Sequence, residues 1–221
     1  MEEKALQTLY ALMGQIGDLL VRNLDWMGWN LFLALIPLAL GLWLFEARRL
    51  SPLLWWPVAA VWLAFLPNAP YVLTDIVHLI EQIRTNLYSV WVVSLALIPL
   101  FILFFLIGFE AYVLSLILLE RFVQRRGLGG WATPLELLLH ALSAVGIYLG
   151  RFLRFNSWDI VTQPSGLVTS LDALISREPL VVMAATFVVL LVLYRLVKVV
   201  TLALITYLQP ALPLGDTRLQ S

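Results

Sequence analysis

The sequence predicts an all-α fold, a polytopic transmembrane helical bundle of about five spans with short amphipathic interfacial helices. Of its 221 residues, 62% are hydrophobic and 13% are charged, whereas soluble domains average about 45–50% and about 25%. Several apolar runs approach or exceed the roughly 20 residues that cross a bilayer as a helix. No repeat or domain boundary is visible, so we expect a single integral membrane domain over residues 1–221.

Charge and cysteine content exclude several classes of protein. Fourteen basic and fourteen acidic residues give a formal net charge of zero, so no global field attracts nucleic acid, and we expect no nucleic-acid partner. The absence of cysteine excludes disulfides, thiol nucleophiles and cysteine-ligated metals. The partner that the composition does predict is the lipid bilayer.

The first 25 residues predict an amphipathic helix that lies in the membrane interface. They begin with Glu2 and Glu3 and lack a continuous apolar core, unlike a signal peptide. Apolar side chains recur at helical spacing while polar ones fall on the opposite stripe. The apolar set is Leu6, Leu9, Met13, Ile16 and Leu20, and the polar set is Gln7, Gln15, Asp18 and Arg22.

Five apolar segments follow, and we predict spans at about 26–46, 52–67, 90–119, 133–153 and 179–208. The second is short for a span, and Pro67 ends it. The last exceeds one membrane thickness and contains Arg195 and Lys198. It is either one long helix or a span followed by an interfacial tail.

Basic residues near the span ends predict the orientation in a bacterial plasma membrane. Eight lie on one side and six on the other, which places the N-terminus outside and the C-terminus in the cytoplasm. The predicted cytoplasmic set is Arg48, Arg49, Arg121, Arg125, Arg126, Arg195, Lys198 and Arg218, and the other is Lys4, Arg22, Arg84, Arg151, Arg154 and Arg177.

The segment LPNAPYVLTDIVHLIEQIR between the second and third spans contains a candidate site. Pro67 and Pro70 predict an extended turn around Asn68, followed by a short helix. On that helix Asp75 and His78 lie three residues apart and point the same way. They predict either a general acid/base or ligand pair at the extracytoplasmic mouth of the bundle, or simply a solvated helix face.

The fourth predicted span carries a polar stripe. Polar side chains within a span normally face the bundle interior, because exposing them to lipid is costly. The alternative is two unrelated halves, with the arginines extending to the interface and the histidine satisfied inside. The members of the stripe are Glu136, His140, Ser143, Gly150, Arg151 and Arg154.

The stripe continues into the loop GRFLRFNSWD. Arg151 and Arg154, one turn apart beside a helix N-terminus capped by Asn156 or Ser157, predict a site for a phosphate or carboxylate group. Asp159 lies in the first turn of that helix. Residues 165–176 have one apolar face and predict a helix that lies flat on the membrane.

Glu110 lies near the predicted midplane of the third span and is a candidate functional residue. One long final helix would bring Arg195 close enough to pair with it. With a shorter final span, Arg195 and Lys198 are interfacial anchors, and Glu110 is neutral or paired elsewhere.

We predict no metal and no cofactor. The chain has only two histidines, so a three-ligand site would need Asp75, His78 and a distant carboxylate such as Asp159. HExxH, the phosphate-loop signature, GxSxG and GxGxxG are absent.

The strings LPNAPYVLTDIVHL and GRFLRFNSWD, together with NLFLALIP in the first span, resemble a family of bacterial multi-pass membrane proteins known only as a domain of unknown function. The resemblance extends from about Asn30 to about Tyr207. It implies that the following residues belong to one shared motif: Asn68, Asp75, His78, Arg151, Arg154, Asn156 and Asp159. It implies no substrate.

Three functions fit this sequence. The preferred one is binding or transport of an anionic ligand, a lipid head group or a phosphate-bearing small molecule, at the extracytoplasmic mouth. The second is a membrane-embedded enzyme with His78 as base and Asp75 as its orienting partner. The third is a structural or assembly subunit without a ligand.

Overall fold

The computed structural model describes residues 2–46, 51–154 and 176–208, and every element in these ranges is helical. The elements are α1 (Glu2–Glu46), α2 (Pro52–Phe65), α3 (Asn68–Tyr71), the 3-10 turn η1 (Val72–Asp75), α4 (Ile76–Arg84), α5 (Val90–Val92), the π-helical turn η2 (Val93–Leu97), α6 (Ile98–Arg125), the 3-10 turn η3 (Gly129–Trp131), α7 (Ala132–Phe152) and α10 (Arg177–Leu208).

Within the part of the chain that the structure describes, five helical segments are long and apolar enough to cross a membrane. They cover residues 6–46, 52–84, 90–125, 129–152 and 177–208. The predicted all-α class with five apolar spans is therefore confirmed, and the protein is a multi-pass membrane protein by length and composition.

The first two predicted elements form one helix. The sequence predicts an interfacial helix over residues 1–25 and a span from residue 26, but α1 continues unbroken from Glu2 to Glu46. At about 1.5 Å per residue α1 is about 68 Å long, twice the thickness of a hydrocarbon core. Tertiary contacts explain the continuity, because Gln15 and Asp18, from the predicted polar stripe, bond to the segment between α4 and α5.

Residues 66–75 interrupt the second apolar segment between α2 and α4. Pro67 and Pro70 lie in this break, but the extended turn predicted around Asn68 is wrong, because the chain forms the short helices α3 and η1 there. Two glycines let it approach its neighbours closely. A Cβ added at Gly108 of α6 would lie 2.5 Å from Val72 Cγ2, and one at Gly146 of α7 would lie 2.6 Å from Pro67 Cγ. Only glycine fits such contacts.

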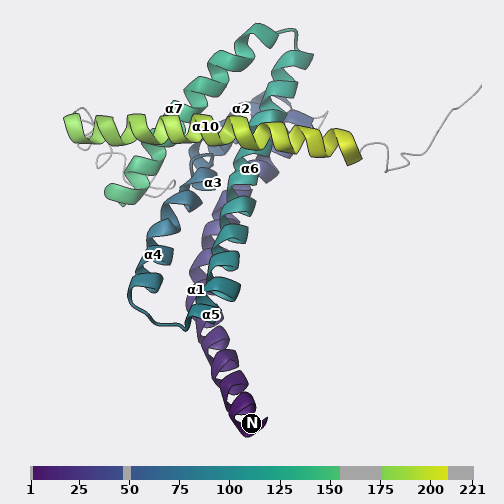
Figure 1. The fold of residues 1–221 in the computed structure, drawn as a ribbon. Coiled ribbons are helices and arrows are strands. Elements are labelled where there is room, and N and C mark those ends of the chain that lie inside the picture. Colours follow the sequence, from purple (N-terminus) through teal and green to yellow (C-terminus); the bar gives the residue numbers. More distant parts are fainter. Residues whose placement is uncertain (1, 47–50, 155–175, 209–221) are drawn as a thin grey trace, which may run out of the picture.

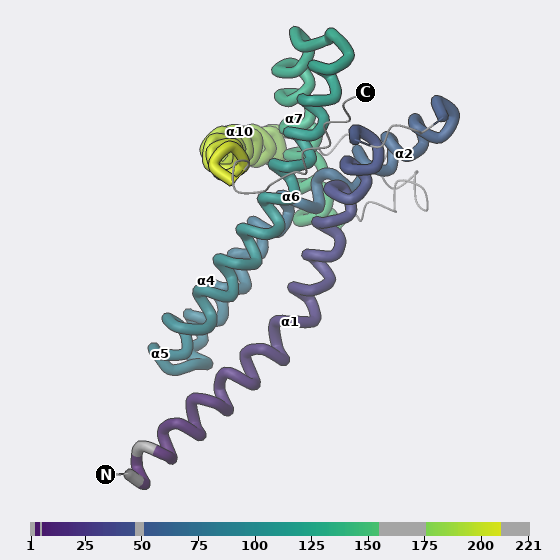
Figure 2. Tube along the Cα trace, turned by 90° about the vertical axis from the view of Figure 1, so that its right-hand side faces the viewer, coloured from purple at the N-terminus to yellow at the C-terminus, as the bar shows by residue number. Residues whose placement is uncertain are grey.

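Figures 1 and 2 show α1 and α6 side by side along much of their length, with α4 beside the lower part of α6. Aromatic side chains fill the contacts in this region, with Trp26 of α1 packed on Phe101 and Phe104 of α6. Where the C-terminal ends of α1 and α6 meet, Arg125 donates two hydrogen bonds to Glu46 and one to the Phe45 carbonyl.

The last apolar block is one helix from Arg177 to Leu208, not a shorter span followed by an interfacial tail. It lies across α6 and α7 in Figure 1 and is seen end-on in the view turned by 90° (Figure 2). Spans of one bilayer usually tilt by less than about 40° each. Because α10 crosses α6 and α7 steeply, its direction differs from that of α1 and α6 by more than is usual between spans of one bilayer.

Candidate functional site

The two sequence motifs meet at Asp75, at the end of η1. Asp75 is 2% exposed. Its Oδ2 accepts a hydrogen bond of 2.8 Å from Asn30 Nδ2 of α1, and its Oδ1 lies 3.7 Å from Arg151 Nη1 of α7. A buried carboxylate needs partners of this kind, since an unpaired one would be strongly destabilising. We name Asn30, Asp75, His78 and Arg151, together with Arg154, which follows Arg151 by three residues, the Asp75 site.

His78 lies beside this carboxylate and is half-exposed. Its Nε2 is 4.0 Å from Asp75 Oδ1, and its ring lies 5.0 Å from the Trp26 ring of α1. The two residues share a face of the helix, as the sequence predicts, but they differ in environment. Asp75 is buried, so the solvated-face alternative does not describe it.

Arg154 follows the end of α7 and is exposed. Its backbone has a φ of 58°, in the left-handed region that a non-glycine residue rarely adopts. Within the described residues its guanidinium forms no ion pair. Asn68 begins α3, close to the Asp75 site along the chain. The predicted helix cap at Asn156 or Ser157, Asp159, and all but the last residue of the flat helix predicted over 165–176 lie outside the described residues.

The α7 stripe faces protein over most of its length, as predicted. Glu136, His140, Ser143 and Ile147 are buried, whereas Leu138 and Leu142 are exposed. The stripe thus joins two polar groups of residues on one helix. Arg151 belongs to the Asp75 site, and Glu136 belongs to a second set.

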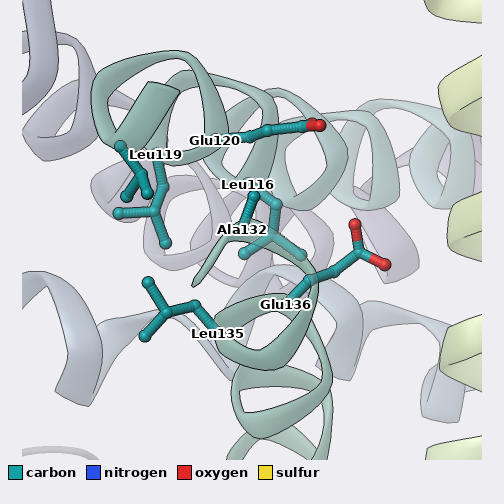
Figure 3. Close-up of a pocket in the computed structure, with 7 residues that line it drawn as sticks. Leu116, Leu119, Glu120, Ala132, Leu135 and Glu136 are labelled. Atoms are coloured by element: carbon teal, nitrogen blue, oxygen red, sulfur yellow. The ribbon is translucent and has the colours of Figure 1, made fainter. Parts of the chain in front are cut away.

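That second set, which we name the Glu136 cluster, joins α6, α7 and α10. Glu136 Oε1 lies 2.7 Å from Arg195 Nη2, and its Oε2 lies 3.4 Å from Lys198 Nζ. Lys198 also lies 2.6 Å from Glu120 Oε2. Figure 3 shows both carboxylates extending toward α10 beside a small pocket lined by Leu116, Leu119, Val123, Ala132 and Leu135.

Glu110 does not pair with Arg195. Its Oε1 instead accepts a hydrogen bond of 2.8 Å from Thr201 Oγ1 of α10, while Arg195 pairs with Glu136. The alternative in which one long final helix pairs Arg195 with Glu110 is therefore wrong in its pairing, although the helix is long. The α10 residues come close enough to reach carboxylates on two helices, so Lys198, which is only 14% exposed, is not an interfacial anchor.

Sequence reasoning missed the α1 partners of the site. Asn30 is the only amide side chain in the apolar stretch from Trp26 to Phe45, and that isolation was a usable signal for a buried contact. Similarly, buried Asn23 exchanges two hydrogen bonds with Gln82 of α4, at 3.1 and 2.8 Å. Both pairs join residues more than 40 positions apart in sequence.

The ranges that the structure describes contain no group of side chains arranged to bind a metal ion. No three His, Asp or Glu side chains there come close enough to hold an ion. The Asp75 site offers one carboxylate and one imidazole, and its remaining charged groups are guanidiniums, which do not ligate cations.

One protein-family model matches most of the chain. A model described as a protein of unknown function, DUF1361, matches residues 29–192. The chain belongs to the DUF1361 family. The matched region contains Asn30, Asp75 and Arg151 of the Asp75 site and Glu120 and Glu136 of the Glu136 cluster. Arg195 and Lys198, the α10 members of the cluster, lie beyond its last residue. No curated protein and no solved structure matches the chain.

Proposed function

We propose that this DUF1361 protein binds, and by extension transports, an anionic group at the Asp75 site. The ligand chemistry is a phosphate or carboxylate, carried by a lipid head group or by a small molecule. The observation that carries the proposal is that Arg151 contacts buried Asp75 while Arg154, three residues later, stays exposed and has no ion-pair partner among the described residues.

The arrangement supports anion binding through charge and rigidity. Asn30 orients Asp75, and Asp75 in turn restrains Arg151, so the guanidinium is oriented before a ligand arrives. Such preorganisation lowers the entropic cost of binding. Arg154 adds a second planar donor group suited to bidentate contact with phosphate. His78, beside Trp26, adds a further donor that is charged only when protonated.

A membrane-embedded enzyme is a second candidate, favoured by one observation. His78 Nε2 faces Asp75 Oδ1 at 4.0 Å, as in a base oriented by a carboxylate. In that case His78→Gln abolishes turnover of a phosphate-bearing lipid but leaves its binding intact. For a binding or transport protein no turnover is observed in either form.

The test compares what co-purifies with wild type, Arg154→Ala and a matched control. Mass spectrometry of the organic extract reports lipids, and that of the aqueous extract reports free phosphate-bearing metabolites. Arg22→Ala is the control, because Arg22 is also an exposed arginine, it lies 3.7 Å from Asp18, and it is about two helical turns from Asn30 along α1.

Arg154→Ala should retain about tenfold less of one anionic species, the loss of one charge-assisted hydrogen bond. The Arg22→Ala control should retain it. Equal retention by both variants, in both extracts, would overturn anion binding at this site. Enrichment confined to the organic or to the aqueous extract identifies the source of the anion.

A further inference from the structure

A buried imidazole, that of His140, lies beside the Glu136 cluster, and the proposed function does not use it. His140 is fully buried. Its Nδ1 lies 2.7 Å from the Tyr112 hydroxyl of α6. Its Nε2 forms no hydrogen bond of regular geometry within the described residues and lies 4.0 Å from Glu136 Oε1. Because an unsatisfied buried polar atom is costly, such a group calls for an explanation.

The surrounding charges fix the resting state of this imidazole. Glu136 and Glu120 supply two negative charges, and Arg195 and Lys198 supply two positive charges within 3.4 Å of them. This set is balanced with His140 neutral. Because Nε2 faces a carboxylate, its proton belongs on Nε2, and Nδ1 then accepts the hydrogen bond from Tyr112.

Ser143 offers the Tyr112 hydroxyl a second hydrogen-bond acceptor besides His140. The Tyr112 hydroxyl is 3.4 Å from Ser143 Oγ, which is an alternative acceptor for it. If Nδ1 gains a proton, it donates to the Tyr112 oxygen, and the Tyr112 hydroxyl turns to Ser143. One added proton therefore leaves every hydrogen bond around Tyr112 satisfied.

We propose that His140 is a proton-binding site, which takes up one proton from water at Nδ1 while Tyr112 changes its acceptor from His140 to Ser143. The Glu136 carboxylate compensates the imidazolium charge at Nε2. Arg195 and Lys198 of α10 face the same ring and oppose uptake, Glu120 of α6 offsets Lys198, and Tyr194 of α10 packs against the ring at 4.9 Å. Uptake therefore depends on Glu136 being ionised.

The sequence makes this site directly observable. The chain has two histidines, so His78→Gln leaves His140 as the only imidazole. In that background, nitrogen-15 NMR of histidine-labelled protein in lipid reports the proton on each ring nitrogen. We expect Nε2–H alone at about pH 8 and a second N–H, on Nδ1, as the pH is lowered toward about 4.

Two further variants separate proton binding from a merely structural role. An opposite charge within about 4–6 Å shifts a titration by about 1–3 units, so Glu136→Gln should remove most of the Nδ1–H signal from this pH window. Glu120→Gln is the matched control, since Glu120 contacts Lys198 and not His140, and it should reduce the signal less. Ser143→Ala should also weaken it while leaving the charges unchanged.

Three results would overturn the proposal. They are no second N–H signal over this window, a neutral ring with its proton on Nδ1, or a titration that Glu136→Gln leaves unchanged. Because His78 belongs to the Asp75 site and is already replaced, a failure of the anion-binding proposal does not alter this readout.

Discussion

At the scale of single residues, the Asp75 site shows why an ion pair here differs from one on a surface. Exposed pairs contribute about 0–1 kcal/mol, because water screens them and the side chains lose entropy. Asp75 is buried and is oriented by Asn30, so removing its charge leaves Arg151 partly buried without a counter-ion. The structural role of the pair is therefore measurable independently of any ligand.

We predict that Asp75→Asn destabilises the protein by about 2–3 kcal/mol, less than the full cost of breaking a buried pair because Arg151 is partly solvated. Thermal or chemical unfolding in detergent measures this. Adding Arg151→Gln to Asp75→Asn should restore part of the loss, since the unpaired charge is then gone. If the double variant is as unstable as the sum of the single variants, the two residues are not coupled.

At the scale of elements, the break between α2 and α4 holds the Asp75 site together. It lies against α6 at Gly108 and against α7 at Gly146. The two prolines predict a break in the chain, but neither its helical conformation nor its neighbours. Proline acts locally, through its own φ and its missing N–H, whereas close packing of a glycine depends on which helix lies opposite.

We predict that Gly146→Ala costs about 1–3 kcal/mol, as overpacking does in a dense core, and separates Asp75 from Arg151. Gly28→Ala is the control, because a Cβ there meets nothing within 4 Å, and it should be neutral or slightly stabilising. Unfolding midpoints of the two variants in the same detergent provide the comparison. Equal midpoints would contradict the close approach.

The contact between α1 and the segment after α4 predicts a dependence on pH. Tyr88 donates a hydrogen bond of 3.0 Å to Asp18. Burial raises the pKa of Tyr88 above its ordinary 10.0, and the Asp18 carboxylate raises that pKa further. Because the folded state favours the neutral phenol, its contribution is complete below about pH 10 and is lost as the pH rises through the raised pKa.

Tyr88→Phe should therefore cost about 1 kcal/mol at neutral pH, the value of one hydrogen bond, and should flatten the loss of stability above about pH 10. Unfolding of both proteins, measured from neutral to alkaline pH, tests this. An identical alkaline loss in the variant would assign it to other groups.

The sequence predicts local features of this molecule better than it predicts contacts between distant residues. The spans and the buried face of α7 follow from hydropathy and helical periodicity, which are local properties. Asp75 and Arg151, 76 positions apart, were expected to converge from topology, and they do. The Glu136 pairs to α10 were not predicted, because the crossing of α10 over α6 and α7 brings Arg195 to α7 instead of to Glu110.

At the scale of the whole molecule, the direction of the chain through the membrane stays a prediction. Alkaline phosphatase fused after Asn86 should be active and fused after Arg126 inactive, since basic residues are retained in the cytoplasm. The reverse pattern would invert the orientation.

The same assay addresses α10, whose composition favours a span although it lies across its neighbours. We expect an active fusion at Ser176 and an inactive one at Leu208. Equal activity at the two positions would place α10 along the membrane surface.

The two glycine contacts also provide a criterion for comparing members of the DUF1361 family. A methyl group at position 108 would lie 2.5 Å from Val72, and one at position 146 would lie 2.6 Å from Pro67. Both distances are far shorter than the van der Waals contact between two carbon atoms. A member with a larger residue there can retain Asp75 and Arg151 in its sequence and still hold them apart. Glycine at these two positions is thus the criterion for deciding which members can inherit the paired site.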